Sequence, residues 1–144
     1  METVQSPDGE LKLISGQDLH QYWPFVKQGL EEAKQYSIED WIAEDVYTAI
    51  RNGTSTLHMA FVDNTYAGFC ILTITQGYSS KNLHIFCAYG VKGMNVVERF
   101  EPEIVKIAKS IGARKITFLS TRRWERRLKD YKAVQTVFEK DLYG

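Results

Sequence analysis

The stretch that decides the fold runs from Asn82 to Leu119 and reads NLHIFCAYGVKGMNVVERFEPEIVKIAKSIGARKITFL in a chain of 144 residues. It begins with an apolar run from Leu83 to Ala88, passes a turn with Gly90 and Gly93, continues as a helical pattern and ends in a second apolar run, 116–119. Such a unit is expected to have parallel strands and a right-handed crossover. Its first turn brings a helix N-terminus to the carboxyl end of a strand, where phosphates are commonly held.

The helical pattern in this unit rests on apolar residues at intervals of three and four. They share one helix face: Val97, Phe100, Ile104, Ala108 and Ile111. Charged residues such as Glu103 are expected on the opposite face, and Gly112 follows as a C-terminal cap. Pro102 lies inside the pattern, where it removes a hydrogen bond at a cost of about 3 kcal/mol. We therefore expect a kink, or a short turn followed by a separate helix that starts at Pro102.

Length and composition limit the classes of protein to which this chain can belong. The chain is the size of one domain, 1–144, in which residues 1–9 lack periodicity and are expected to be a flexible arm. No apolar run approaches the roughly 20 residues of a membrane span, and the N-terminus has no signal pattern, so we expect a cytoplasmic protein without membrane contact. Net charge is zero, so nucleic acid would need a local patch. Cys70 and Cys87 lie in apolar runs, which predicts packing.

Upstream of the central unit, the patterns predict a strand, two helices and a hairpin. The strand covers Leu11–Ile14, the helical patterns cover 17–34 and 38–50, and the antiparallel hairpin joins 55–62 to 66–75. Pro24 interrupts the first helical pattern, which leaves two short helices as an alternative. Ser37 with Asp40 resembles a capping box for the second helix.

Downstream of the unit, we expect a short basic helix over 122–129 and a final strand over Tyr131–Leu142. In that strand Val134, Thr136 and Phe138 alternate with their neighbours. Helices grouped before a hairpin and a single crossover exclude a doubly wound fold. They predict an α+β fold, with a mostly antiparallel mixed sheet, one parallel β-α-β crossover and flanking helices.

This order of elements resembles the GNAT (Gcn5-related N-acetyltransferase) superfamily over nearly the whole chain. The matching pieces are the central unit and three further segments: WPFVKQGLEEAKQYSIEDWIAEDVYTAIRNG (23–53), LHMAFVDNTYAGFCILTI (57–74) and RRWERRLKDYKAVQTVFEK (122–140). The pairing of the first segment with the last is similar to small GNAT-like proteins encoded by tailed phages. The resemblance implies two central strands that splay apart and accept a coenzyme.

The coenzyme implied by the resemblance is acetyl-CoA. Its pantetheine arm would lie along the central strand and its pyrophosphate in the following turn. The matching positions are Phe86, Cys87 and Ala88 for the arm and Gly90, Val91, Lys92, Gly93, Met94 and Asn95 for the turn. Tyr89 or Gly90 stands where the family has Arg or Gln, and Asn95 stands where it has a small residue. Arg122 or Arg123 is a further candidate for a phosphate contact.

His84 is the candidate general base, because it stands on the central strand where some family members have a glutamate. The alternative is a histidine with a structural role only. The family's tyrosine, which protonates the leaving thiolate, is matched by Arg126 or Arg127, and a cation could only stabilise the thiolate electrostatically. His20 and His58 have no other ligand at metal-binding spacing, so no metal site is expected.

Three functions are compatible with these residues, and the sequence leaves open whether the protein is an enzyme. The first is transfer of an acetyl group from acetyl-CoA to an amine acceptor, mostly by positioning. The second is a non-catalytic, phage-encoded GNAT-fold protein that acts in the virion or binds a host protein. The third and weakest is nucleic-acid binding through the arginines of 122–127, which otherwise form a solvated helix face. An exposed sheet edge would also allow a homodimer.

Overall fold

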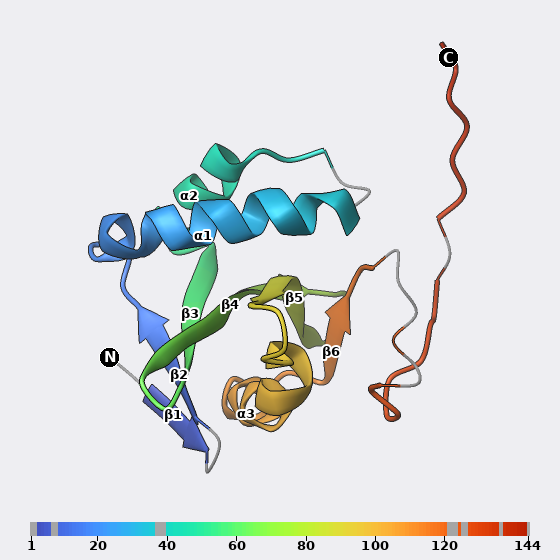
Figure 1. Ribbon diagram of the computed structural model, residues 1–144. Coiled ribbons are helices and arrows are strands. Elements are labelled where there is room, and N and C mark those ends of the chain that lie inside the picture. Colours follow the sequence, from blue (N-terminus) through green and yellow to red (C-terminus); the bar gives the residue numbers. More distant parts are fainter. Residues whose placement is uncertain are drawn as a thin grey trace.

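The computed structural model describes residues 3–6, 9–36, 40–120, 124, 127–135 and 137–143. Within them, one six-stranded sheet has the order β1-β2-β3-β4-β5-β6, with α1 and α2 over one face and α3 over the other (Figure 1). The elements are β1 (Thr3–Ser6), β2 (Gly9–Ile14), α1 (Leu19–Ala33), a 3-10 turn (Lys34–Tyr36), α2 (Ala43–Arg51), β3 (Ser55–Val62), β4 (Thr65–Gln76), β5 (Lys81–Gly90), α3 (Val96–Ser110) and β6 (Lys115–Phe118). All neighbouring strands are antiparallel except β5 and β6, which are parallel. The expected α+β fold with one parallel crossover is confirmed.

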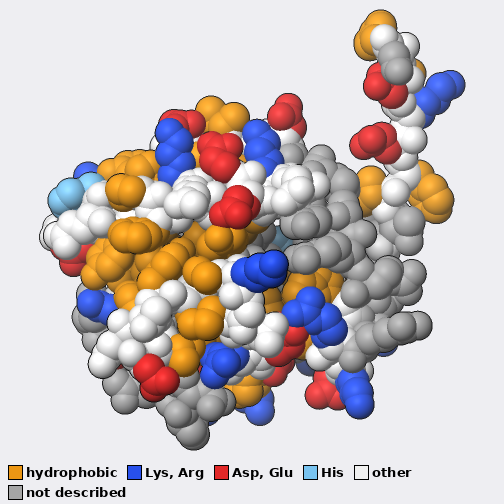
Figure 2. All heavy atoms as spheres, in the orientation of Figure 1, with side chains coloured by type: hydrophobic (Ala, Val, Ile, Leu, Met, Phe, Trp, Pro, Cys, Tyr) orange, Lys and Arg blue, Asp and Glu red, His pale blue; other side chains and the backbone are white. Residues whose placement is uncertain are grey.

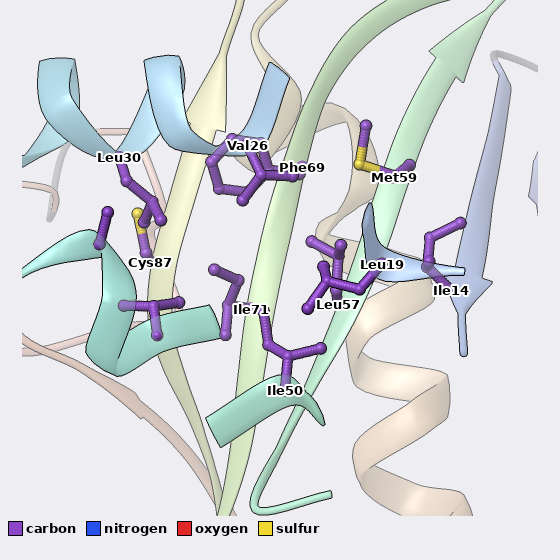
Figure 3. Close-up of a cluster of buried hydrophobic side chains, with 12 residues drawn as sticks. Ile14, Leu19, Val26, Leu30, Ile50, Leu57, Met59, Phe69, Ile71 and Cys87 are labelled. Carbon is purple, nitrogen blue, oxygen red and sulfur yellow. The ribbon is translucent and has the colours of Figure 1, made fainter. Parts of the chain in front are cut away.

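The sheet carries a buried cluster on each face. Beneath α1 and α2 lie the residues of the first cluster, including Leu19, Val26, Leu30, Leu57, Met59, Phe69 and Ile71 (Figure 3). Beneath α3 lie those of the second, including Leu11, Leu72, Leu83, Ile85, Phe100 and Ile104. A sheet covered on both faces buries both sides of its central strands, which explains why β4 and β5 read as nearly continuous apolar runs.

At the N-terminus the structure differs from the expected flexible arm. Thr3–Ser6 forms β1 and pairs antiparallel with β2, with Val4 opposite Leu11. A strand of four residues is too short to show a periodic pattern, and its ladder is made by backbone groups that any residue supplies. The pairing therefore could not be read from the side chains.

Both proline-containing helices are continuous. Pro24 lies inside α1 and Pro102 inside α3, so the alternative of two separate helices is wrong for both segments, and the other alternative at Pro102, a kink, stays a prediction. One missing hydrogen bond does not break a helix whose apolar stripe is packed on both sides of the proline, as Phe100 and Ile104 are in α3. Glu103 is buried rather than exposed, because a residue three positions after Phe100 lies on the same helix face.

The second helix and the hairpin differ in how closely they match the expectation. α2 starts at Ala43, later than the pattern predicted, and Ile42 N–H donates to the Asp45 carboxylate at 3.1 Å. Ser37, from the expected capping box, lies outside the described residues. The hairpin is confirmed, and its turn residues Asp63 and Asn64 have φ of 51° and 64°, as its tight two-residue connection requires.

The C-terminal segment departs most from the expectation. The described residues of 131–143 form no strand, and the segment runs away from the body of the molecule (Figure 1). Residues 127–130 form a turn rather than the end of a basic helix. Alternating side chains make a segment suited to a sheet, but a strand exists only where a partner supplies the hydrogen bonds.

Among the helices of the described residues, none combines the length and the apolar composition that a membrane span requires.

Candidate functional site

The two parallel strands separate after Ile85. Their pairing joins Asn82–Ile85 to Lys115–Phe118, whereas β5 continues to Gly90. Among the described residues, no strand lies beside 86–90 on the side that β6 leaves. Successive backbone groups of a strand point to opposite edges, so part of the N–H and C=O groups of 86–90 face this opening. They can form hydrogen bonds with a ligand that carries amide groups.

A β-bulge marks the point of separation. Ile85 is opposite Leu72 and Cys87 is opposite Ile71, which leaves Phe86 without a partner on β4. Phe86 and Cys87 both pack into the cluster beneath α1 and α2, so strict alternation ends at this point. Burial raises the pKa of the Cys87 thiol to about 12. Cys87 is therefore protonated near neutral pH, and only its backbone is suited to ligand contact.

The turn after β5 is held by backbone hydrogen bonds. Val91 N–H donates to Ala67 O at 2.8 Å, and Met94 N–H donates to Val91 O at 3.0 Å. Gly93 and Asn95 have φ of 87° and 49°. Glycine adopts this left-handed conformation freely, and asparagine tolerates it better than most residues. The turn therefore forms even though Asn95 replaces the small residue of the GNAT pattern.

α3 begins directly after this turn. Arg99 N–H donates to Asn95 O at 2.9 Å, so the N–H groups between them have no helical acceptor. Glu98 lies in this first turn, but its carboxylate is paired with the guanidinium of Arg127. Arg99 also donates from Nε to Met94 O at 3.1 Å, beside the turn. Sequence reasoning placed Arg99 on the solvent face of the helix, and its contact with the turn depends on the folded position of Met94, which no local pattern shows.

His84 belongs to a row of polar side chains across four strands. The register places Ser55 opposite Thr73, Thr73 opposite His84, and His84 opposite Thr117. Two hydrogen bonds of 2.9 Å join Ser55 Oγ to Thr73 Oγ1 and His84 Nδ1 to Thr117 Oγ1. Directly opposite residues share a sheet face, so the row links β3 to the parallel strands. The contact with Thr117 fixes the imidazole next to the point where β5 and β6 separate.

A pocket of about 140 Å³ lies at the β3 end of this row. It is lined by Trp41, Asp45, Val46, Ala49, Ser55 and Phe86. The rings of Trp41 and Phe86 lie 5.3 Å apart, and Phe86 is the bulge residue of β5. The lining is mostly apolar with a single carboxylate, which suits a small ligand that has an apolar body and a positive charge.

The structure gathers most of the predicted site residues around one end of β5. Phe86, Cys87 and Ala88 continue β5 past the separation, and residues 90–95 form its last residue and the following turn. Arg122, Arg123 and Arg126 lie outside the described residues. Within the described part of the chain, no three side chains of His, Cys, Asp or Glu gather as a metal site. The roles of the predicted residues stay predictions.

Tyr89, one of the two residues at the position of the family's Arg or Gln, points toward α1. Its hydroxyl donates to the Glu32 carboxylate at 2.7 Å, and its ring stacks on Phe69 with 5.5 Å between centroids. The hydrogen bond to Glu32 and partial burial raise the pKa of Tyr89. Tyr89 therefore acts in the contact between β5 and α1 rather than in the turn.

Solved structures of acetyltransferases share the fold of this chain. A ribosomal-protein-alanine N-acetyltransferase from Brucella melitensis biovar Abortus 2308 superposes with a TM-score of 0.64 at 14% identity, over 94% of this chain and 99% of that one. A predicted acetyltransferase from Clostridium acetobutylicum, solved with acetyl-CoA, gives 0.65 at 13% identity, over 92% and 95%. An aminoglycoside acetyltransferase from an uncultured soil metagenomic sample, in complex with sisomicin, gives 0.65 at 12% identity, over 92% and 95%.

No protein-family model matches the sequence, and no curated protein matches it. The likeness is therefore one of fold. The chain has the GNAT acetyltransferase fold.

Proposed function

We propose that the protein is an acetyl-CoA-dependent N-acetyltransferase that modifies an amine acceptor. The observation that carries this proposal is the separation of β5 from β6 after Ile85, followed at once by the turn 91–95 and the N-terminus of α3. Similar structures support it, since one acts as a ribosomal-protein-alanine N-acetyltransferase by its name and another was solved with acetyl-CoA.

The residues around the opening fit this coenzyme. Backbone groups of Phe86, Cys87 and Ala88 would pair with the amides of the pantetheine arm, because β6 no longer occupies that side of β5. The turn around Gly93 and the first N–H groups of α3 would bind the pyrophosphate, since a side chain built at Gly93 would meet nothing within 4 Å and the space beside it is open. Bound there, the coenzyme supplies an activated acetyl group as a thioester.

The pocket and the polar row from Ser55 to Thr117 would bind the amine acceptor and move its proton. The pocket beside Trp41 would hold the apolar part of the acceptor, and the carboxylate of Asp45 would attract its ammonium form. His84 would take one proton from the ammonium, and the free amine nitrogen would then bond to the acetyl carbon while the carbon–sulfur bond breaks. The electron pair would leave on sulfur, and the second proton of the nitrogen would pass to the resulting thiolate. Thr117 would keep the imidazole oriented through Nδ1 during this transfer.

Calorimetric titration with acetyl-CoA tests the binding step directly. We expect saturable heat, and we expect mass spectrometry to show acetyl transfer to members of a panel of small aromatic and aliphatic amines. Absence of heat at millimolar acetyl-CoA would remove the enzymatic proposal. Binding without transfer to any amine, peptide or protein acceptor would favour the second candidate.

The second candidate is a GNAT-fold protein without catalysis, encoded by a phage and acting in the virion or on a host protein. Asn95 in the turn and the missing tyrosine favour it, as does the engagement of Tyr89 with Glu32. Purified particles should then contain the protein, or a host factor should co-purify with it from the host cytoplasm. Absence from both would contradict this candidate.

Nucleic-acid binding has less support. Arg127 is paired with Glu98 and lies 4.6 Å from the Trp124 ring, so its charge is already engaged. A gel shift that is lost in high salt and lost on changing the arginines of 122–127 to alanine would restore this candidate.

A further inference from the structure

The C-terminal arm, defined as residues 132–143, exposes large apolar side chains. Val134 is 78% exposed, Phe138 91% and Tyr143 97%, and Val137 and Leu142 are also exposed. Figure 2 shows the arm projecting from the body with hydrophobic groups along it. Single exposed apolar residues are ordinary on a protein surface, whereas several along one extended segment indicate a surface that is covered in another state.

The arm is fixed to the body only at its base. Tyr131 donates from its hydroxyl to the Glu101 carboxylate on α3 at 3.0 Å, and its ring lies 5.7 Å from that of Phe118 at the end of β6. Beyond this anchor, the described residues of the arm make one hydrogen bond, from Tyr143 N–H to the Asp141 carboxylate. The backbone groups of the arm are therefore available for pairing.

The outer edge of β6 offers the matching surface. β6 is the last strand of the sheet, and among the described residues no strand pairs with its outer side. Ile116 and Phe118 are only partly buried there, at the margin of the cluster beneath α3. Folded proteins usually cover or protect such an edge, because its unpaired N–H and C=O groups recruit other strands.

We propose that the arm of one copy adds a strand to the outer edge of β6 in a second copy, and that the second copy does the same in return. In an extended arm Val134 and Phe138 lie on one side, and Gln135, Val137 and Glu139 lie on the other. In this arrangement Val134 and Phe138 extend the margin of the cluster beside Ile116 and Phe118, where Phe118 already contacts Trp124 and Tyr131.

A second copy is the occupant that the structure favours. Each chain carries both the arm and the edge, so a two-fold exchange satisfies both surfaces at once and closes the assembly. The chain's own arm leaves the neighbourhood of its own β6 after Tyr131 rather than lying along it (Figure 1). The inference does not rest on acetyl transfer, since a dimer can form whether or not acetyl-CoA binds.

Light scattering on the full chain tests the assembly. We expect a dimer for the natural sequence and a monomer for V134D/F138D, with unchanged circular dichroism because neither side chain touches the body. Gln135→Asp is the matched control, since it adds charge to the side of the same arm opposite Val134 and Phe138 and should stay dimeric. A monomeric natural chain, or a V134D/F138D variant that stays dimeric, would overturn the exchange.

Cross-linking between two differently tagged chains distinguishes exchange from an arm that folds back on its own β6. One chain carries Lys115→Cys on β6 and the other Val137→Cys on the arm. The natural cysteines are buried and react poorly, since burial raises the pKa of Cys70 and Cys87 to about 12. After coexpression, a bismaleimide should join the two tagged chains. Cross-links found only within a single chain that carries both substitutions would contradict the exchange.

Discussion

His84 is held from the neighbouring parallel strand, and this contact determines how it should respond to substitution. Thr117 approaches Nδ1 at 2.9 Å, so a glutamine at position 84 could keep a polar contact while losing the ability to titrate. The distinction separates a catalytic role from a purely structural one.

We predict that His84→Gln lowers kcat by about 10²- to 10⁴-fold, the usual contribution of a general base, while acetyl-CoA binding is unchanged. Steady-state kinetics and calorimetry measure the two quantities. His20→Gln is the matched control, because His20 is exposed at the start of α1 and its Nδ1 contacts the Gln17 carbonyl. An unchanged kcat would assign His84 to the structural alternative.

Gly93 and Gly112 form a matched pair for testing the turn. Both have left-handed φ, 87° and 76°, and a Cβ at either position would meet nothing within 4 Å. Alanine at each should cost a similar 1–2 kcal/mol or so of unfolding free energy. Only Gly93→Ala should also weaken acetyl-CoA binding, by about tenfold or more, because only Gly93 lies in the turn after β5. Equal affinities in the two variants would place the pyrophosphate elsewhere.

At the scale of elements, α3 tolerates a proline that its packing compensates. Pro102 is exposed, and the buried side of the helix beside it is formed by residues such as Phe100 and Ile104. Packing decides that the helix is continuous, but it does not recover the missing hydrogen bond.

We predict that Pro102→Ala raises the free energy of unfolding by about 2 kcal/mol. Removing the proline from the helix interior stabilises the folded state by roughly 3 kcal/mol. Its removal also makes the unfolded chain more flexible, which lowers the stability by up to about 1 kcal/mol. Urea titration measures it, and Pro24→Ala in α1 is the companion variant, because Pro24 is also exposed inside a helix. A less stable Pro102→Ala variant would mean that the proline gives α3 the geometry it needs to pack against the sheet.

For the whole molecule, one buried histidine makes the fold sensitive to acid. His58 on β3 is 7% exposed, and burial lowers its pKa from 6.5 to about 4. Between these values the unfolded chain binds a proton that the folded chain does not, so stability is full above pH 6.5 and falls as the pH drops toward 4. The maximum loss is about 3 kcal/mol.

Urea titrations between pH 7 and pH 4 should therefore show a steep decline that His58→Gln makes shallower. The same slope in the natural chain and in His58→Gln would show that other groups set the acid sensitivity. The expectation that 1–144 forms one domain stays a prediction, and a single cooperative transition in these titrations would support it.

Apolar periodicity and turn residues are local properties, so the residues alone predicted the helices, the central hairpin and the parallel crossover. The sequence also placed the turn between Gly90 and Asn95, where two left-handed residues are required. It placed two segments wrongly, since β1 gained a partner strand and the C-terminal arm has none in the described chain.

The resemblance implied that the central strands splay apart, but the place after Ile85 where β5 leaves β6, the bulge at Phe86 and the row from Ser55 to Thr117 are visible only in the folded sheet. All three depend on the register between strands that are distant in sequence. Register is set by long-range pairing and packing of the whole sheet, so no local pattern of residues specifies it.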